Sequence, residues 1–107
     1  MSDDSFVNYL TSCDVHDGTV RRVAREDDRL RVTVECADGR FLILEFGGLR
    51  SVKMNRAVGM VLYSLSEMKE SQPYRRFVFT NWDEQADACL EVVALEMTCD
   101  EIPKGTV

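Results

Sequence analysis

The chain has 107 residues and a mass of 12.2 kDa, which is enough for one hydrophobic core and excludes architectures built from two lobes or from eight βα units. A composition that is 45% hydrophobic and 30% charged, with six Gly and two Pro, is typical of a globular domain and excludes disordered and fibrous chains. Thirteen Lys and Arg residues against nineteen Asp and Glu give a net charge of -6, which disfavours nucleic acid as a partner.

We expect no targeting or membrane-spanning segment in this chain. The first residues are acidic where a secretory signal is basic, and no apolar run approaches the ~18 residues that a membrane span requires. We therefore expect one cytoplasmic domain over residues 1–107 that does not bind membranes. Because that compartment keeps thiols reduced, we expect all four cysteines to be free, namely Cys13, Cys36, Cys89 and Cys99.

A short helix is predicted over about residues 3–12. Ser2 or Asp3 can cap it, and its apolar residues recur at helical spacing as Phe6, Val7 and Leu10. A helix of this length is marginal by itself, so its apolar side is expected to pack against one end of a sheet.

Residues 19–46 are expected to form three antiparallel strands. Val20 and Val23 are out of phase by one residue, which indicates a bulge or an edge strand. After a turn at residues 26–28, residues 30–36 alternate strictly between apolar and polar, and an Asp-Gly pair at 38–39 is typical of a tight hairpin turn. Residues 41–46 are nearly all apolar, which predicts a central strand.

The segment 49–70 is ambiguous between helix and strand. Apolar residues step by four and three along a helical stripe, at Met54, Val58, Val61, Leu65 and Met68. However, Val61, Tyr63 and Leu65 also alternate, and Gly59 opposes a helix interior. A hairpin from a strand at 60–69 into a strand at 75–82 is the simplest topology, so we favour strand and leave 56–69 open between the two.

A long last strand is predicted over residues 89–99, and residues 103–107 are expected to fray. The predicted fold is therefore mainly β: a single antiparallel, strongly bent sheet or partly open barrel of about six strands over residues 19–99, with one N-terminal helix. Its expected core residues are Leu30, Val32, Val34, Leu42, Leu44, Phe46, Phe77, Phe79, Val93 and Leu95.

The densest group of reactive side chains lies at residues 13–17. In an enzyme, Cys13 would be the nucleophile, His16 its base and Asp17 the group that orients the imidazole. Such pairs are usually assembled from distant segments, and a turn at residues 16–18 explains the same residues, so we expect no catalytic site. We also expect no metal and no cofactor, because the cysteines lack zinc-finger spacing and the glycines do not match a phosphate-binding loop.

The arginines are the second group with a functional interpretation. Those of residues 21–31, with the aromatic residues of 74–77, could bind single-stranded nucleic acid. The pattern favours a simpler role, in which arginines on the outer face of a sheet pair with carboxylates on neighbouring strands, here Glu35, Glu45 and Glu91.

Trp82, at the end of a predicted strand, is either a core residue or an interface anchor. The usual burial of aromatic side chains favours the core.

The chain resembles a diffuse group of small bacterial all-β proteins. The features that carry the resemblance are His16-Asp17-Gly18 before the first strand, the alternating second strand, and Phe46-Gly47-Gly48-Leu49 at the end of the third, where the group usually has Val in place of Leu49. The group includes domains of unknown function and immunity-like proteins of bacterial toxin systems. The resemblance covers about residues 15–98, implies strands in the later segments, and identifies no catalytic residues.

We therefore expect a non-enzymatic protein-interaction domain, immunity-like in character, that presents an acidic surface to a basic protein partner. The candidate partner-binding residues are Asp27, Asp28, Trp82, Asp83 and Glu84. Two alternatives stay open: a small thiol-dependent or hydrolase-like enzyme that uses Cys13 and His16, and a homo-oligomeric structural domain that pairs through an open sheet edge.

Overall fold

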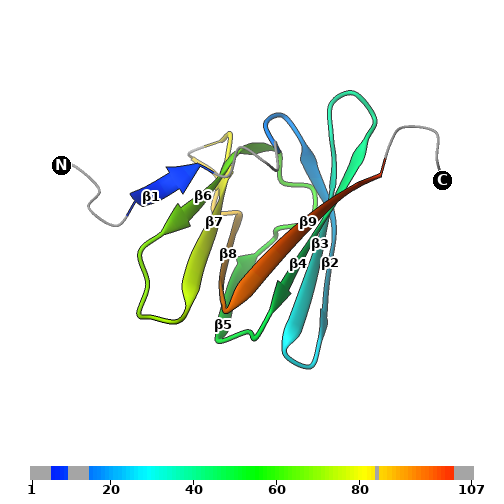
Figure 1. Cartoon of the computed structure of the whole chain (residues 1–107). Coiled ribbons are helices and arrows are strands. Elements are labelled where there is room, and N and C mark those ends of the chain that lie inside the picture. The colour runs from blue at the N-terminus through cyan, green and yellow to red at the C-terminus, as the bar shows by residue number, and fades with distance from the viewer. Residues whose placement is uncertain (1–5, 10–14, 84, 103–107) are drawn as a thin grey trace.

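The computed structural model describes residues 6–9, 15–83 and 85–102, which form nine strands and no helix (Figure 1). None of these residues belongs to a helix that could cross a membrane. The strands are β1 (Phe6–Tyr9), β2 (Thr19–Glu26), β3 (Arg29–Glu35), β4 (Phe41–Gly47), β5 (Ser51–Asn55), β6 (Leu62–Met68), β7 (Arg75–Asn81), β8 (Cys89–Ala94) and β9 (Glu96–Ile102).

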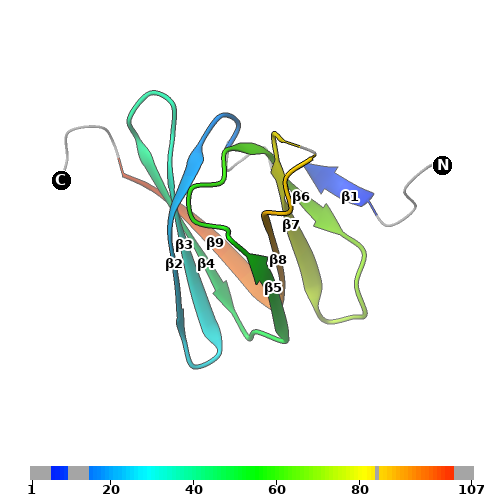
Figure 2. The ribbon, with the colours of Figure 1, turned by 180° about the vertical axis from the view of Figure 1, so that it is seen from behind.

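The strands form two antiparallel sheets. The five-stranded sheet has the order β1-β6-β7-β8-β5 and the four-stranded sheet the order β2-β3-β4-β9. Both views of the ribbon show the sheets as two separate layers (Figures 1 and 2). The mainly β prediction is confirmed. The single bent sheet or partly open barrel of six strands is wrong, because the described strands build two layers, which cover each other's apolar faces without closing a barrel.

The core lies between the two layers. Phe46 of β4 meets Phe77 and Phe79 of β7 across the interface, with ring centroids 5.2 and 6.1 Å apart. We call these three residues the core ring cluster. Around it pack Val15, Val20, Leu30, Val32, Val34, Cys36, Leu42, Leu44, Ala57, Met60, Leu62, Leu65, Leu90, Val92 and Ala94.

The strands predicted between residues 19 and 46 are confirmed as β2, β3 and β4. The register of β2 against β3 shifts between Val20 and Arg22, so the expected bulge is present, and β2 is also an edge strand. Turns join the strands at Asp27, which has a φ of 53°, and at Gly39, which has a φ of 93°. The apolar strand β4 lies between β3 and β9, as its composition predicts.

The predicted N-terminal helix is wrong where the structure describes it. Residues 6–9 form the strand β1, which pairs with β6 at the edge of the five-stranded sheet. A short apolar run fits both periodicities, and two aromatic residues and a Val among four favour the extended form once a sheet edge is available. The remaining residues of 3–12 and the tail at 103–107 lie outside the described residues.

The ambiguous segment contains two strands joined by a turn and no helix. The predicted hairpin from 60–69 into 75–82 is confirmed as β6 and β7, and residues 51–55 add β5, which was not predicted. The helical stripe is wrong because Met54, Val58 and Val61 are exposed, whereas a helix would have buried them on one face.

The predicted last strand is two strands, divided at Leu95. Val92 and Ala94 of β8 point into the core, whereas Met97 and Cys99 of β9 pack against the same core one residue out of phase. The chain therefore changes sheets at Leu95, which is 46% exposed rather than buried as predicted. Gly48, with a φ of 67°, allows this crossing, because a Cβ there would lie 2.5 Å from Cδ1 of Leu95. Val93 is buried as predicted but stands outside the main core cluster.

The cysteines only partly match the expectation. Cys36 and Cys89 are not disulfide-bonded. Cys99 is disulfide-bonded, which contradicts the prediction that all four cysteines are free. The prediction of four reduced thiols rested on the expected compartment, which the residues around Cys99 do not determine.

Candidate interaction site

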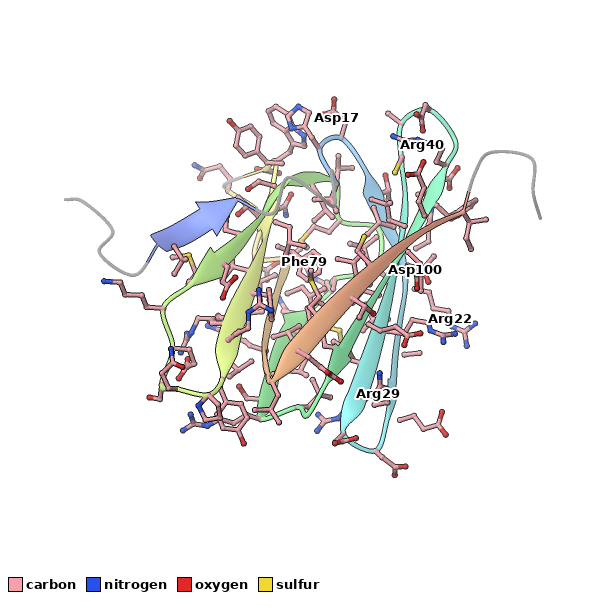
Figure 3. The ribbon with its side chains drawn as sticks, in the orientation of Figure 1. Asp17, Arg22, Arg29, Arg40, Phe79 and Asp100 are labelled. Atoms are coloured by element: carbon pink, nitrogen blue, oxygen red, sulfur yellow. The ribbon has the colours of Figure 1, made fainter. Side chains whose placement is uncertain are left out.

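An exposed aromatic cluster lies beside the start of β2, where three segments of the chain meet. His16 and Asp17 come from the turn before β2, Tyr63 comes from β6, and Trp82 is the residue directly after β7. The centroids of the Tyr63 and Trp82 rings are 4.8 Å apart at an interplanar angle of 84°, and the His16 ring lies 5.5 Å from Tyr63 and 5.4 Å from Trp82. We call these four residues the end cluster. Figure 3 shows Asp17 at this end of the molecule.

Backbone hydrogen bonds to the first part of β6 hold the three segments together. The Asp17 amide donates to the Leu62 carbonyl at 2.9 Å, and the Leu62 amide donates to the Gly18 carbonyl at 2.7 Å. The Trp82 amide donates to the Val61 carbonyl at 3.0 Å. The same turn passes close to β3 at Gly18, where a Cβ would lie 2.6 Å from Cγ1 of Val34. The end cluster therefore rests on a fixed backbone.

A β-bulge turns Tyr63 outward. Leu62 pairs with Asn81 and Ser64 with Thr80, so Tyr63 is the extra residue between them. The bulge allows Leu62 and Leu65 to point into the core while Tyr63 stays 45% exposed. Bulges often redirect a side chain next to a functional site.

Side-chain hydrogen bonds fix the orientation of the polar groups. The Trp82 indole Nε1 donates to Asp17 Oδ1 at 2.9 Å. The His16 Nδ1 lies 2.9 Å from the Tyr63 carbonyl oxygen, which can only accept, so Nδ1 carries a proton and donates. The His16 Nε2 lies 3.7 Å from Asp17 Oδ2. Asp17 has a φ of 65°, a left-handed conformation that Asp and Asn tolerate better than other side chains.

One further exposed apolar side chain adjoins the end cluster. The exposed large hydrophobic residues of the described segments are Val7, Met54, Val58, Val61, Tyr63, Trp82 and Leu95. Tyr63 and Trp82 belong to the end cluster, and Val61 adjoins it through the hydrogen bond from the Trp82 amide. Trp82 is 46% exposed, so the interpretation of this residue as part of the core is wrong. Half-exposed aromatic rings with satisfied polar groups are typical of interface anchors.

The predicted partner-binding residues fall at two ends of the molecule. Trp82 and the exposed Asp83 lie at the end cluster, and Glu84 lies outside the described residues. Asp27 and Asp28 are exposed in the turn after β2. The eight residues of β2 separate the two places by about 25 Å. The sequence did not indicate Tyr63 as a site residue. The alternation of residues 61, 63 and 65 places Tyr63 on the same face as Leu65, which is buried.

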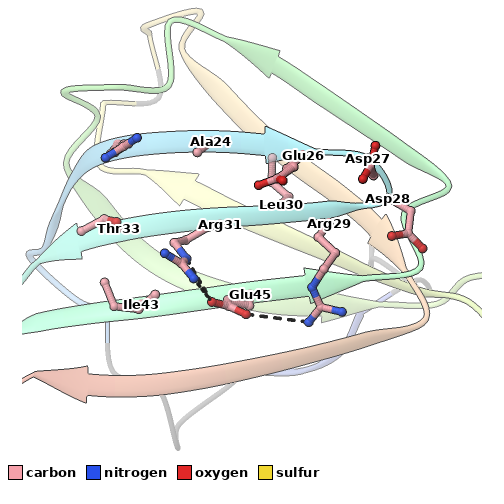
Figure 4. Close-up of a pocket in the computed structure, with 11 residues that line it drawn as sticks. Ala24, Glu26, Asp27, Asp28, Arg29, Leu30, Arg31, Thr33, Ile43 and Glu45 are labelled. Atoms are coloured by element: carbon pink, nitrogen blue, oxygen red, sulfur yellow. Dashed lines mark hydrogen bonds and ion pairs between the residues drawn. The ribbon is translucent and has the colours of Figure 1, made fainter.

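Most arginines on the outer face of the four-stranded sheet are neutralised within the chain. A depression of about 520 Å³ opens over β2, β3 and β4 (Figure 4). There Arg31 donates to Glu45 at 2.6 Å from Nη2, and Arg29 lies 3.7 Å from the same carboxylate. The predicted pairing is confirmed by these contacts and by Arg21 with Glu35 and Arg76 with Glu91. This face therefore offers little positive charge to a nucleic acid.

The residues proposed for thiol chemistry are only partly placed. Asp17 does lie beside His16, but Cys13 is outside the described residues. The imidazole stands among exposed rings and uses Nδ1 for a carbonyl oxygen. Within the described segments, no three His, Cys, Asp or Glu side chains gather as metal ligands.

No protein-family model, no curated protein and no solved structure matches this chain.

Proposed function

We propose that this protein is a non-enzymatic protein-interaction domain that binds a basic protein partner through the end cluster and the adjacent Asp83. An immunity-like role, in which the domain covers and neutralises its partner, is the form of binding that the sequence resemblance favours. The observation that carries the proposal is the preorganised group of exposed rings around Trp82. Rings that are already fixed lose little conformational entropy on binding, which raises affinity.

The charge of the chain supports a basic partner. The net charge is -6, and the end cluster contains a carboxylate but no Lys or Arg. Complementary charge mainly speeds association, and its range is ~8–10 Å at physiological salt. Rings at the centre with charge around them are a common arrangement in protein interfaces.

The experiment compares matched baits. The wild-type chain and the Trp82→Ala and Met54→Ala variants are used to capture partners from cells that express the protein, and the captured protein is purified and titrated against each variant. Met54 is as exposed as Trp82 but lies on β5, so its replacement controls for loss of exposed apolar surface.

We expect Trp82→Ala to weaken binding at least about tenfold and Met54→Ala less than about twofold, as for an anchor and a peripheral residue. Raising the salt concentration should slow association because it screens the steering charges. Equal affinities of the two variants, or an association rate that does not change with salt, would contradict the proposal.

A further inference from the structure

The end cluster has the parts of an arginine receptor, and we infer that the basic partner inserts an arginine side chain over the Trp82 and Tyr63 rings, against the Asp17 carboxylate. This inference rests on the proposed function and names the chemistry of the partner's anchor.

The first support is the exposed aromatic surface. Trp82 and Tyr63 are 46% and 45% exposed, and the two rings meet edge to face at 84°. The faces of Trp and Tyr attract cations, with Trp the strongest of the aromatic side chains. In the described part of the chain, neither ring has an arginine or lysine of the protein over it.

The second support is the position of the carboxylate. Asp17 Oδ1 lies 2.9 Å from the Trp82 Nε1, so the carboxylate stands at the edge of the indole ring. A cation that stacks on the ring therefore also meets a negative charge. The Asp17 side chain is 54% exposed, and its Oδ2 has a contact of 3.7 Å with His16, which leaves room for a further donor.

The third support comes from the arginines of the chain. Arg75 lies 5.0 Å above the Phe77 ring and donates two hydrogen bonds to Glu67, at 2.8 and 2.9 Å. Arg50 lies 5.3 Å above the Tyr74 ring and 3.5 Å from Glu70. In both places an arginine fills the space between a ring and a carboxylate. The end cluster presents the same pair of groups at the surface.

The chemistry favours arginine over lysine. A planar guanidinium can stack on an aromatic ring and donate to a carboxylate at the same time, whereas an ammonium group is a compact, strongly hydrated charge. The site is therefore expected to distinguish the two residues.

The test uses Trp82 as the reporter, because it is the single Trp of the chain and its fluorescence responds at the site itself. The full-length protein is titrated at constant ionic strength with a capped pentapeptide that has a central arginine flanked by threonine and valine. The same peptide with citrulline, which keeps the shape but lacks the charge, and with lysine are the matched ligands.

We expect a saturable change of emission with the arginine peptide and an affinity about tenfold lower for citrulline, since both the cation–π and the ionic contacts are lost.

Asp17→Asn should weaken arginine binding about threefold to fivefold while keeping an oxygen that can accept from the Trp82 indole. Asp100→Asn is the control, because it removes the same charge from an exposed position on β9, which belongs to the other sheet from Tyr63 and Trp82. Tyr63→Leu, which keeps apolar bulk but removes a ring, should weaken binding about threefold.

Equal binding of arginine and citrulline, or of arginine and lysine, overturns the inference. So does an equal effect of Asp17→Asn and Asp100→Asn, which would show a response to net charge alone. If a protein partner binds in a Trp82-dependent way while the arginine peptide does not, the proposed function stands and this inference fails. If the peptide binds and the partner ignores Trp82, the proposed function fails instead.

Discussion

The molecule contains two groups of aromatic rings with similar spacing and opposite surroundings. In the core ring cluster, Phe46 lies 5.2 and 6.1 Å from Phe77 and Phe79, and all three are buried between the sheets. In the end cluster, the ring centroids are 4.8–5.5 Å apart, but Tyr63 and Trp82 keep nearly half of their surface in solvent. Ring geometry alone therefore does not separate a structural cluster from a binding surface, whereas burial does.

The polar groups also separate the two clusters. The core ring cluster contains only hydrocarbon rings, so its contribution is to stability through burial and contact. In the end cluster, an indole N–H donates to a carboxylate and an imidazole donates to a backbone carbonyl, and these groups lie at the surface. A surface group that is held in place without being covered contributes less to folding and is available to a partner.

The largest expected effect is that of a change in the core ring cluster. Phe77→Ala should lower the free energy of unfolding by about 3–5 kcal/mol, because it opens a cavity between the sheets. Urea denaturation followed by circular dichroism measures this change. Phe77→Leu, which fills more of the space, should cost less, and a loss below about 1 kcal/mol for the alanine variant would mean that the sheets pack differently.

Trp82→Ala should lower the stability less than Phe77→Ala does. Its main effect should be on binding. About half of the Trp82 surface is buried, and at ~25 cal/mol per Å² its loss should lower the free energy of unfolding by about 2 kcal/mol at most. The same denaturation experiment measures it, together with the partner titration. A loss as large as that of Phe77→Ala would show that the end cluster is structural.

Asp17→Ala should lower the free energy of unfolding by about 1–2 kcal/mol. The change removes the acceptor for the Trp82 indole, and it places Ala at a φ of 65°, a left-handed conformation that is unfavourable for this residue. Asp17→Asn, which tolerates that backbone and keeps an acceptor, is the control and should cost only a few tenths of a kcal/mol. Thermal unfolding of the three proteins compares them, and equal losses for Ala and Asn would contradict the role given to the hydrogen bond.

The sequence predicts the parts of the fold in which periodicity and turn chemistry agree. Strict alternation in β3 and an Asp-Gly pair before β4 indicate a hairpin with one buried face, and the structure has both. The division at Leu95 could not be predicted, because alternation continues on both sides of the point where the chain changes sheets. The pattern shows that strands are present, but not which sheet each strand joins.

The end cluster shows a similar limit. His16 and Trp82 could each be singled out as unusual residues. Nothing in the sequence shows that pairing of the start of β6 with the end of β7 brings them together. Tyr63 was missed because a bulge reverses its face, and a bulge is set by the packing of Leu62 and Leu65 rather than by Tyr63 itself. Residues from three segments meet only through tertiary structure.

The smallest expected effect concerns the margin of the core ring cluster, where Arg75 covers Phe77 and pairs with Glu67. The hydrogen bonds from Arg75 lower the pKa of the Glu67 carboxyl below its usual value. A carboxyl with a lowered pKa in the folded state stabilises the fold above its unfolded pKa of about 4.5, and this contribution is lost as the pH falls through the folded value.

Glu67→Gln should therefore lower the free energy of unfolding by about 0.2–1 kcal/mol at pH 7, and the difference from wild type should shrink below pH 4.5. Denaturation at a series of pH values measures this, with Glu96→Gln as the control, because Glu96 is 66% exposed and lies 3.9 Å from Arg29. A difference that grows towards acid would mean that the ion pair does not favour the charged form of Glu67, and the arginine–ring–carboxylate arrangement would lose its value as a guide to the end cluster.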